Sequence, residues 1–321
     1  MQPTQSPSLP MIPEPNRLSS LTAVLVNHRR WLDTARCIQL LELAGLPAEQ
    51  VIVVDTASGD DSVTRLASRL PAGNLLSLPD NAGFAGGSNA GISTALVQGA
   101  QAVLLLNTDT VFRTDFLARL TGDAADLTGM CVSPEIFWSS APSRTWFAGA
   151  WRGRLPGTLR LRHSGDAHTA VDYLWACCLL VGRAVWEAVG FLHPRFFLYY
   201  EDMAWCDRAR RAGFDLRVVP AARLWHAVGS STGGQDSPLR RYHLTRSSVL
   251  FFNGHGPAAV ALRCLVDART AAQLAAAGRA DLVKAHLLGC RDGWRTVVSG
   301  KGSTPQAIVI GNGSARHPGQ L

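Results

Sequence analysis

Two adjacent carboxylic acids, Glu201 and Asp202, follow a run of aromatic residues in "FFLYYEDMAWCDRARRAGF" (196–214). Apolar surroundings raise the pKa of a carboxylic acid toward neutrality, the range in which a general base works. The aromatic rings could supply these surroundings and a surface on which a sugar or a base stacks. The alternative is a helix N-terminus capped by one of the acids, with Gly213 ending the helix. Both interpretations can hold together.

A second group of polar residues could bind a divalent metal. Asp109 in "NTDT" (107–110) ends a predicted buried strand, and Asn107 lies on the same side of an extended segment. Oxygen ligands suit Mg²⁺ or Mn²⁺, which are often shared with substrate phosphates. His226 in "RLWHAVGSS" follows another strand and could complete a ligand pair with Asp109. Alone, Asp109 would more commonly cap a helix and His226 would be structural, so the prediction depends on both.

The segment "DNAGFAGGSNAGI" (80–92) contains four glycines, at positions 83, 86, 87 and 91. It matches neither the dinucleotide fingerprint nor the P-loop. Glycines let the backbone approach a ligand closely, and a helix expected to begin around 88–92 would offer its N-terminus to a phosphate. A tight loop that joins a strand to a helix without binding anything is the alternative, and the motif alone leaves both open.

Three short apolar runs predict the strands that position these residues, at 21–27, 50–58 and 102–110. Helical patterns at 31–43 and 60–70 alternate with them, which indicates a parallel α/β sheet covered on both faces. Ligands of such sheets bind beyond the carboxyl ends of the strands, where Asn27, Asp55 and Asp109 lie.

Later segments are less regular. Strands are expected at 171–181 and 215–220, and a helix at 183–189. Beyond residue 237, glycine-rich breaks at 254–256, 278 and 289–293 predict two or three amphipathic helices.

Length and composition set the domain organisation. A chain of 321 residues with 47% hydrophobic and 17% charged residues suits a globular protein with a large core. Residues 1–20 are rich in Pro, Ser and Gln and lack the apolar region of a signal peptide, so we expect a disordered leader. The predicted division is this leader, an α/β domain at 21–235 and a basic helical region at 236–321.

The charge is distributed unevenly. Residues 1–235 contain 20 basic and 20 acidic residues, whereas residues 236–321 contain 11 basic and 4 acidic ones. A basic helical tail of this kind predicts contact with an anionic membrane surface; a helical cap with a solvated basic face is the alternative. No run of about 18 uncharged apolar residues predicts a transmembrane helix.

Seven cysteines without a C-x-x-C pair indicate neither a disulfide framework nor a thiolate zinc site. They favour a reducing compartment. We therefore expect a cytoplasmic protein, with peripheral contact at the inner face of the membrane left open.

Six segments, in order over residues 21–232, resemble the inverting family 2 glycosyltransferases and, within them, the rhamnosyltransferase branch. They are "VLVNHRR", "VVDTASGDDS", "NAGFAGGSNAGI", "LLLNTDT", "FFLYYEDMAWCDRARRAGF" and "WHAVGSST". Six matches in order are far more specific than any one alone. The resemblance implies a GT-A fold, a Rossmann-like, mostly parallel sheet flanked by helices, here with a C-terminal helical extension.

The resemblance also implies roles for single residues. Asp55 would contact the base or ribose, and Asp109 would hold Mg²⁺ or Mn²⁺ against the diphosphate, with His226 close to the metal. Asp202 would be the base that deprotonates the acceptor hydroxyl, supported by Glu201. The implied nucleotide-sugar site comprises Asn27, Asp55, Asn81, Gly83, Gly86, Gly87, Asn89 and Asn107.

Two positions depart from the common family pattern. Thr56 stands where Asn is usual after the strand-end acid, and Asn107 occupies the first position of the D-x-D motif. Asn at that position is usual in the rhamnosyltransferase branch, so it supports the resemblance.

The implied reaction is metal-dependent, inverting transfer of a sugar, L-rhamnose from dTDP-rhamnose, to a saccharide or polyprenyl-diphosphate-linked acceptor in cell-surface polysaccharide synthesis. A galactofuranosyl or other hexosyl transferase that uses a UDP-sugar is one alternative. A silent nucleotide-sugar-binding scaffold is another, although it would lack Asp109 or the acidic pair. The missing glycine fingerprint disfavours a nucleotidyltransferase or a dinucleotide-dependent oxidoreductase, and no motif for nucleic acid binding occurs.

Overall fold

The computed structural model describes residues 17–122, 126–154, 158–161, 170–229, 233–234 and 236–299. Residues 1–16 of the predicted leader and 230–232 of "WHAVGSST" lie outside these ranges. The N-terminal half contains η1 (Arg17–Ser20), β1 (Leu21–Asn27), α1 (Trp31–Leu43), η2 (Ala48–Gln50), β2 (Val51–Thr56), α2 (Ser62–Ala67), β3 (Leu75–Leu78), α3 (Gly83–Val97), β4 (Ala102–Leu106), β5 (Thr110–Phe112) and α4 (Phe116–Thr121).

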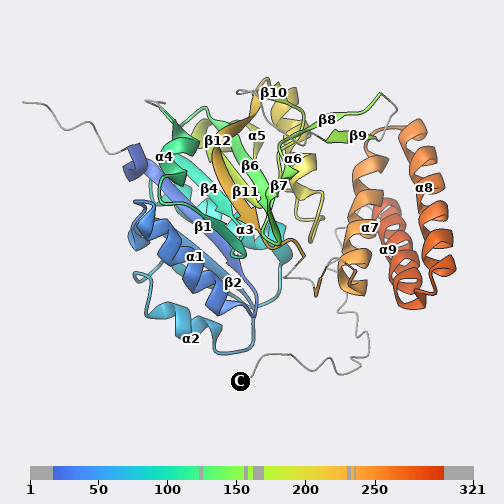
Figure 1. The fold of residues 1–321 in the computed structure, drawn as a ribbon, viewed down its shortest axis with the longest axis horizontal. Coiled ribbons are helices and arrows are strands. Elements are labelled where there is room, and N and C mark those ends of the chain that lie inside the picture. Colours follow the sequence, from blue (N-terminus) through green and yellow to red (C-terminus); the bar gives the residue numbers. More distant parts are fainter. Residues whose placement is uncertain are drawn as a thin grey trace, which may run out of the picture.

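Four parallel strands of this half lie side by side in the order β4, β1, β2 and β3. Helix α1 covers one face of these strands and α3 the other, in front and behind in Figure 1. Strands β1, β2 and β4 are buried almost throughout, which explains their continuous apolar sequence. The predicted parallel α/β arrangement is confirmed, and β1 and α1 have the expected bounds.

The second half extends the sheet with antiparallel pairs. It contains β6 (Cys131–Trp138), β7 (Ala141–Phe147), β8 (Ala150–Arg152), β9 (Leu159–Leu161), β10 (Ala170–Val171), β11 (Cys178–Gly182), α5 (Arg183–Val189), α6 (Glu201–Arg211) and β12 (Leu216–His226). Strand β11 lies between β4 and β6 and is antiparallel to both. The main sheet runs in the order β10-β12-β6-β11-β4-β1-β2-β3, so it is mixed but keeps its parallel core.

The predicted single strand at 171–181 is wrong, because residues 172–177 leave the sheet between β10 and β11. This segment crosses the carboxyl end of β4, where the Asn107 N–H donates a hydrogen bond of 2.9 Å to the Cys177 carbonyl. The strand expected at 215–220 is longer and continues through a bulge to His226. Both differences bring side chains to the same edge of the sheet.

The glycine-rich segment is helical from its first glycine, so the expected helix start around 88–92 is wrong. Gly87 and Gly91 face the sheet: a Cβ on Gly87 would lie 2.9 Å from a Val26 methyl group, and one on Gly91 would overlap Val24. These two glycines therefore allow α3 to pack closely on β1 and β2. Gly86 lies in the first turn of α3 and is half-buried.

Within the described part of the C-terminal region, three helices stand beside the sheet: α7 (Pro238–Asn253), α8 (Pro257–Ala276) and α9 (Ala280–Ser299) (Figure 1). The breaks at 254–256 and 278 are confirmed. The break at 289–293 is wrong, because Gly289 and Gly293 lie inside α9, where a Cβ would meet α7 at 2.7 Å and 2.8 Å. Among the described helices, none is long and apolar enough to cross a membrane.

Candidate active site

The carboxyl ends of β1 and β2 carry a buried polar network. The Asn27 side-chain amide donates hydrogen bonds to Asp55 (2.6 Å) and to the Ser58 hydroxyl (3.2 Å), and its oxygen accepts one from Thr34 (2.7 Å). Asp55 also accepts hydrogen bonds from the Ser58 N–H and hydroxyl. Asn27 and Asp55 are buried, so this network shapes the loops after the two strands.

Residues missed by the sequence analysis form the accessible part of this edge. His28 and Arg29 are exposed and directly follow Asn27, which is the signal that could have identified them. The His28 Nδ1 lies 2.9 Å from the Thr56 carbonyl, which requires this nitrogen to donate. Its Nε2 then accepts, 3.5 Å from the Asn81 amide nitrogen. The Asn81 oxygen in turn accepts a hydrogen bond from the Gly83 N–H at the start of α3.

Asn89 lies on α3 away from this edge. Its side-chain nitrogen donates to the Leu192 carbonyl (2.8 Å) and its oxygen accepts from the Leu192 N–H (2.9 Å). The Asn89 side chain thus ties α3 to the loop after α5. Because both of its polar atoms bind the Leu192 backbone, we do not assign Asn89 to the donor site.

Asp109 and His226 meet at the neighbouring edge, although they are far apart in sequence. Strand β12 pairs with β5 so that His226 lies opposite Thr110, and the Ala227 N–H donates to the Asp109 carbonyl. The His226 Nε2 lies 3.1 Å from Asp109 Oδ1 and 3.4 Å from the Asn107 side-chain nitrogen. Both of these side chains are almost fully buried, with His226 7% and Asp109 5% exposed. The predicted pair is therefore brought together.

This geometry fits a divalent cation. Mg²⁺ takes octahedral ligands at about 2.0–2.1 Å, so neighbouring ligand atoms lie about 3.0 Å apart. The distance of 3.1 Å between Asp109 Oδ1 and His226 Nε2 matches this separation. Mg²⁺ commonly uses one or two protein ligands and completes its shell with water and substrate phosphates. The chemistry of the two groups thus suits a metal shared with a diphosphate.

Glu201 and Asp202 form the first turn of α6, at the positive end of the helix dipole. The two preceding residues, Tyr199 and Tyr200, have φ angles of +68° and +65°, a left-handed conformation that non-glycine residues rarely adopt. Such strain is often kept at functional sites by the surrounding structure. The expected helix start at the acidic pair is confirmed, but the N-cap residue is Tyr200 and no side chain caps α6, so the expected capping by one of the acids is wrong.

The two acids differ in their surroundings. Asp202 is half-buried and accepts a hydrogen bond of 3.1 Å from the Ala176 N–H. Burial raises the pKa of Asp202 to about 6. Glu201 is buried, and its Oε2 has no hydrogen-bond partner among the described residues. Burial, and then the charge of Asp202, raise the pKa of Glu201 well above its usual value. Burial therefore favours the protonated form of Glu201, while a pKa of about 6 leaves Asp202 able to ionise near neutral pH and makes it the candidate base.

The loop that leads into α6 is held by elements on two sides. The Phe84 N–H of α3 donates to the Phe197 carbonyl (2.9 Å), and a side chain at Gly83, where φ is +69°, would overlap Phe197. From α7, the Ser247 hydroxyl donates to the Leu198 carbonyl (2.8 Å) and the buried Arg246 donates to the Arg195 carbonyl (3.1 Å). The first helix of the basic region is thus part of the support of the acidic pair.

The middle of α6 is anchored by Asp207. This buried carboxylate accepts hydrogen bonds from Arg152 of β8 (2.5 Å) and from His255, just after α7 (2.8 Å). Burial acts to raise the pKa of Asp207, but the hydrogen bonds from His255 and Arg152 outweigh it and lower the pKa. The same contact with Asp207 raises the pKa of His255.

Residues 175–177 connect the acidic pair with the predicted metal ligands. The Ala176 N–H binds Asp202, and the Cys177 carbonyl accepts from Asn107, two residues before Asp109. The Trp175 ring lies 4.5 Å from the Trp146 ring, which lies 5.0 Å from the His226 ring. Trp138 is 5.8 Å from Trp146. We call Trp138, Trp146 and Trp175 the tryptophan wall; all three are partly accessible.

Sequence analysis missed the tryptophan wall. The tryptophans of "FWSSAPSRTWFAGAW" and "VDYLWACC" were the available signal, but the position of Trp138 and Trp146 depends on the pairing of β6 with β7, and Trp175 lies in the segment between β10 and β11.

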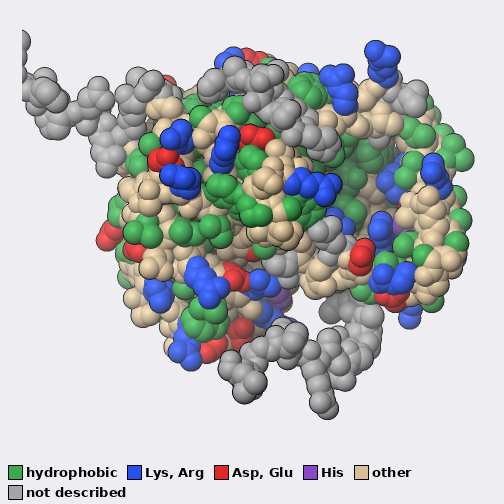
Figure 2. All heavy atoms as spheres, viewed as in Figure 1, with side chains coloured by type: hydrophobic (Ala, Val, Ile, Leu, Met, Phe, Trp, Pro, Cys, Tyr) green, Lys and Arg blue, Asp and Glu red, His purple; other side chains and the backbone are tan. Residues whose placement is uncertain are grey.

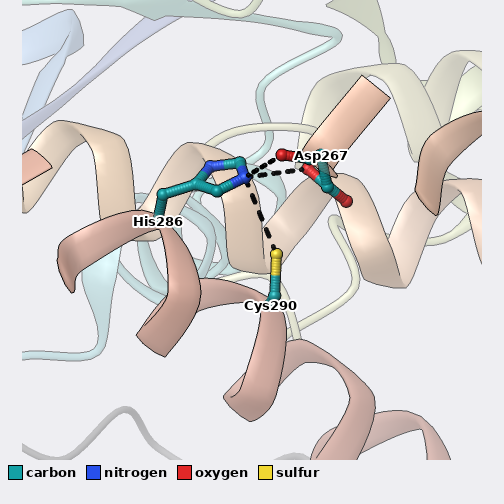
Figure 3. A group of neighbouring side chains, drawn as sticks. All are labelled: Asp267, His286 and Cys290. Atoms are coloured by element: carbon teal, nitrogen blue, oxygen red, sulfur yellow. Dashed lines mark hydrogen bonds and ion pairs between the residues drawn. The ribbon is translucent and has the colours of Figure 1, made fainter. Parts of the chain in front are cut away.

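A second group of potential metal ligands lies between α8 and α9, where His286 points toward Asp267 and Cys290 (Figure 3). The His286 Nε2 lies 3.1 Å from the Asp267 main-chain carbonyl, so this nitrogen donates and offers no lone pair. The Asp267 carboxylate is bound by Arg263. Burial raises the pKa of Cys290 to about 11, which keeps it a thiol. The group is therefore a hydrogen-bonded contact between helices.

Comparison with known proteins places this geometry in a family. The family model described as "Glycosyl transferase family 2" matches residues 22–181, about half of the chain. The dTDP-rhamnosyl transferase RfbF of Shigella flexneri is 24% identical over 78% of this chain and 88% of its own length. The N-acetylglucosaminyl-diphospho-decaprenol L-rhamnosyltransferase of Mycobacterium tuberculosis is 40% identical over 38% of this chain and 36% of its own length.

Among solved structures, the mannosyltransferase PcManGT of Pyrobaculum calidifontis, in complex with GDP-Man and Mn²⁺, has a TM-score of 0.52 and 15% identity. The match covers 88% of this chain and 86% of that one. The likeness is one of fold, and it confirms the expected GT-A architecture. With the family match and the relatives above, it leads to one conclusion: the chain is a glycosyltransferase and belongs to glycosyltransferase family 2.

Proposed function

We propose that this glycosyltransferase moves L-rhamnose from dTDP-rhamnose to a saccharide acceptor carried on a polyprenyl diphosphate, in the synthesis of a cell-surface polysaccharide. One observation supports the reaction type: residues 176–177 contact both the candidate base and the proposed metal site. The Ala176 N–H donates to Asp202, and the Cys177 carbonyl accepts a hydrogen bond from Asn107, two residues before Asp109. The donor and acceptor classes rest on the names of the two relatives, a dTDP-rhamnosyl transferase and a rhamnosyltransferase whose named substrate is a diphospho-decaprenol.

The proposed donor site lies along the ends of β1, β2 and β4. His28, Arg29 and Asn81 offer the accessible polar groups for the nucleotide, while Asn27 and Asp55 hold the loops that present them. Asp109, His226 and Asn107 would hold Mg²⁺ or Mn²⁺. When bound, this cation would supply positive charge to the diphosphate leaving group. Mn²⁺ is present in the structure of PcManGT.

Asp202 would receive the proton of the acceptor hydroxyl. The hydroxyl oxygen then forms a bond to the anomeric carbon as the bond from that carbon to the diphosphate breaks on the opposite face, which inverts the configuration. The proton stays on Asp202 and the nucleoside diphosphate leaves with the bonding pair. Burial and the charge of Asp202 raise the pKa of Glu201, so ionisation of the pair would fall first on Asp202, whose pKa is about 6.

The tryptophan wall would form the acceptor side of this site, since sugar rings stack on aromatic faces. Trp146→Ala is expected to raise the acceptor KM about tenfold, because a truncated stacking residue loses roughly 1–2 kcal/mol. Donor affinity measured by calorimetry should stay within about twofold. Trp31→Ala, at a partly accessible tryptophan in the first turn of α1 outside the wall, is the matched control. An unchanged acceptor KM, or an equal loss of donor affinity, would remove the wall from the acceptor site.

Release of nucleoside diphosphate from a panel of nucleotide sugars tests the proposed donor. The purified chain, supplied with Mg²⁺ or Mn²⁺ and a synthetic polyprenyl-diphosphate acceptor, should act on dTDP-rhamnose at least about tenfold faster than on UDP-sugars. Faster release from UDP-galactofuranose would establish the galactofuranosyl alternative. Binding of a nucleotide sugar without release from any donor would instead indicate a silent scaffold.

A further inference from the structure

We propose that the outer face of α8 and α9 docks this enzyme onto the anionic surface of a lipid bilayer. This docking face consists of Leu265, Val266, Lys284, Leu287, Arg291 and Val298. The inference rests on the proposed function only in that a lipid-linked acceptor would lie at such a surface. Docking itself requires no substrate and can be tested without one.

Helix α8 has little contact with the rest of the protein. Of its 20 residues, only Ala259 and Asp267 are buried. Most of its exposed side chains are apolar, among them Leu265 at 69% and Val266 at 42% exposed, and Arg269 is exposed as well. On α9, Leu287 is 54% exposed and Val298 is 85% exposed. Figure 2 shows hydrophobic and basic side chains along the outer edge of this helical region. The sequence alternative was a helical cap whose solvated face is basic. The exposed surface of α8 and α9 is apolar as well as basic, so a basic face describes only part of it.

A groove between the end of α8 and α9 is lined by both apolar and basic residues. Its volume is about 620 Å³, and apolar side chains, Ala275, Val283, Leu287 and Leu288, line it. Lys284 and Arg291 lie in the same lining. An apolar groove bordered by cations suits the boundary between lipid headgroups and acyl chains, where an amphipathic surface buries its apolar side and presents its cations to phosphates.

The net positive charge of α8 and α9 favours an anionic bilayer over a second copy of the chain as the partner. Residues 257–299 contain six basic and three acidic residues. Each acid is already paired: Asp267 with Arg263, Asp281 with Arg279, and Asp292 with Arg291 and Tyr242. An anionic bilayer attracts such a surface. In a two-fold contact with a second copy, the same patch would face itself, and its cations would repel each other.

Co-sedimentation of the full chain with vesicles tests the proposal. Vesicles of phosphatidylglycerol and phosphatidylcholine should bind the protein, vesicles of phosphatidylcholine alone should bind it at least about tenfold more weakly, and salt should release it. The double variant Lys284→Glu with Arg291→Glu should lower binding to the anionic vesicles by about tenfold or more. Leu265→Ser with Leu287→Ser should also lower it, since apolar burial contributes.

The matched control is Arg36→Glu with Arg69→Glu, an equal change of charge at exposed positions of the sheet domain, which should bind as the unmodified chain does. Transfer to a water-soluble acceptor should be the same in all these variants, so a failure of docking is distinguishable from a failure of the proposed function. Equal binding to neutral vesicles, or equal losses in control and test variants, would overturn the proposal. So would a dimer in sedimentation velocity that Leu265→Ser with Leu287→Ser dissociates while vesicle binding is absent.

Discussion

Asp202→Asn is expected to lower turnover by a factor on the order of 10² or more, while donor affinity stays close to that of the unmodified enzyme. The amide keeps the size of the side chain and can still accept the hydrogen bond from the Ala176 N–H. It cannot accept the proton of the acceptor hydroxyl. The comparison requires turnover in a purified transfer assay and donor affinity by calorimetry.

Glu201→Gln provides the matched control, because the two acids are neighbours with different surroundings. Glu201 is buried, and burial raises its pKa well above its usual value, which favours the protonated form that glutamine resembles. We expect turnover to change by less than about tenfold. Near-normal turnover in Asp202→Asn together with a large loss in Glu201→Gln would reverse the assignment of the base.

The pH profile of the unmodified enzyme gives a second view of Asp202. Burial raises the pKa of this carboxyl to about 6, and a general base works only when it is deprotonated. Activity should therefore rise with pH through about pH 6 and fall below it, and the residual activity of Asp202→Asn should lack this limb. A limb that persists in the variant would belong to another group.

Asp109→Ala is expected to lower metal-dependent donor affinity by about tenfold or more, on the scale of losses seen when the ligand sphere of a metal is disturbed. The substitution removes the carboxylate that faces His226 at 3.1 Å and leaves His226 and Asn107 at the proposed metal site. Calorimetric titration of the nucleotide with and without Mn²⁺ should show the loss only when metal is present.

Asp115→Ala is a suitable control for this measurement, since Asp115 is an exposed acid at the start of α4 that pairs with Arg119. His226→Ala should lower metal-dependent donor affinity by the same factor as Asp109→Ala or by a smaller one, because it removes another of the three proposed ligands. If donor affinity in the presence of Mn²⁺ is the same in Asp109→Ala and Asp115→Ala, Asp109 does not hold the metal.

The sequence by itself determined the elements whose character is local. Buried strands read as continuous apolar runs, so β1 and the positions of Asn27 and Asp55 at strand ends could be predicted. The strand expected to end on Asp109 stops at Leu106, and Asp109 lies in the turn that leads from β4 into β5. Glu201 and Asp202 could be placed at a helix start because capping signals lie within a few residues. The six motifs in order indicated glycosyltransferase family 2, and the match to the family model confirms this membership.

Only the tertiary structure decided which of these residues meet and what surrounds them. The contact of Asp109 with His226 depends on the pairing of β5 with β12, and the tryptophan wall depends on the pairing of β6 with β7. The difference between Glu201 and Asp202 arises from burial, which α7, α3 and residues 175–177 create together. Sequence patterns report local preference, whereas burial and long-range pairing are properties of the folded chain, and in this protein they give Asp202 and Glu201 different surroundings.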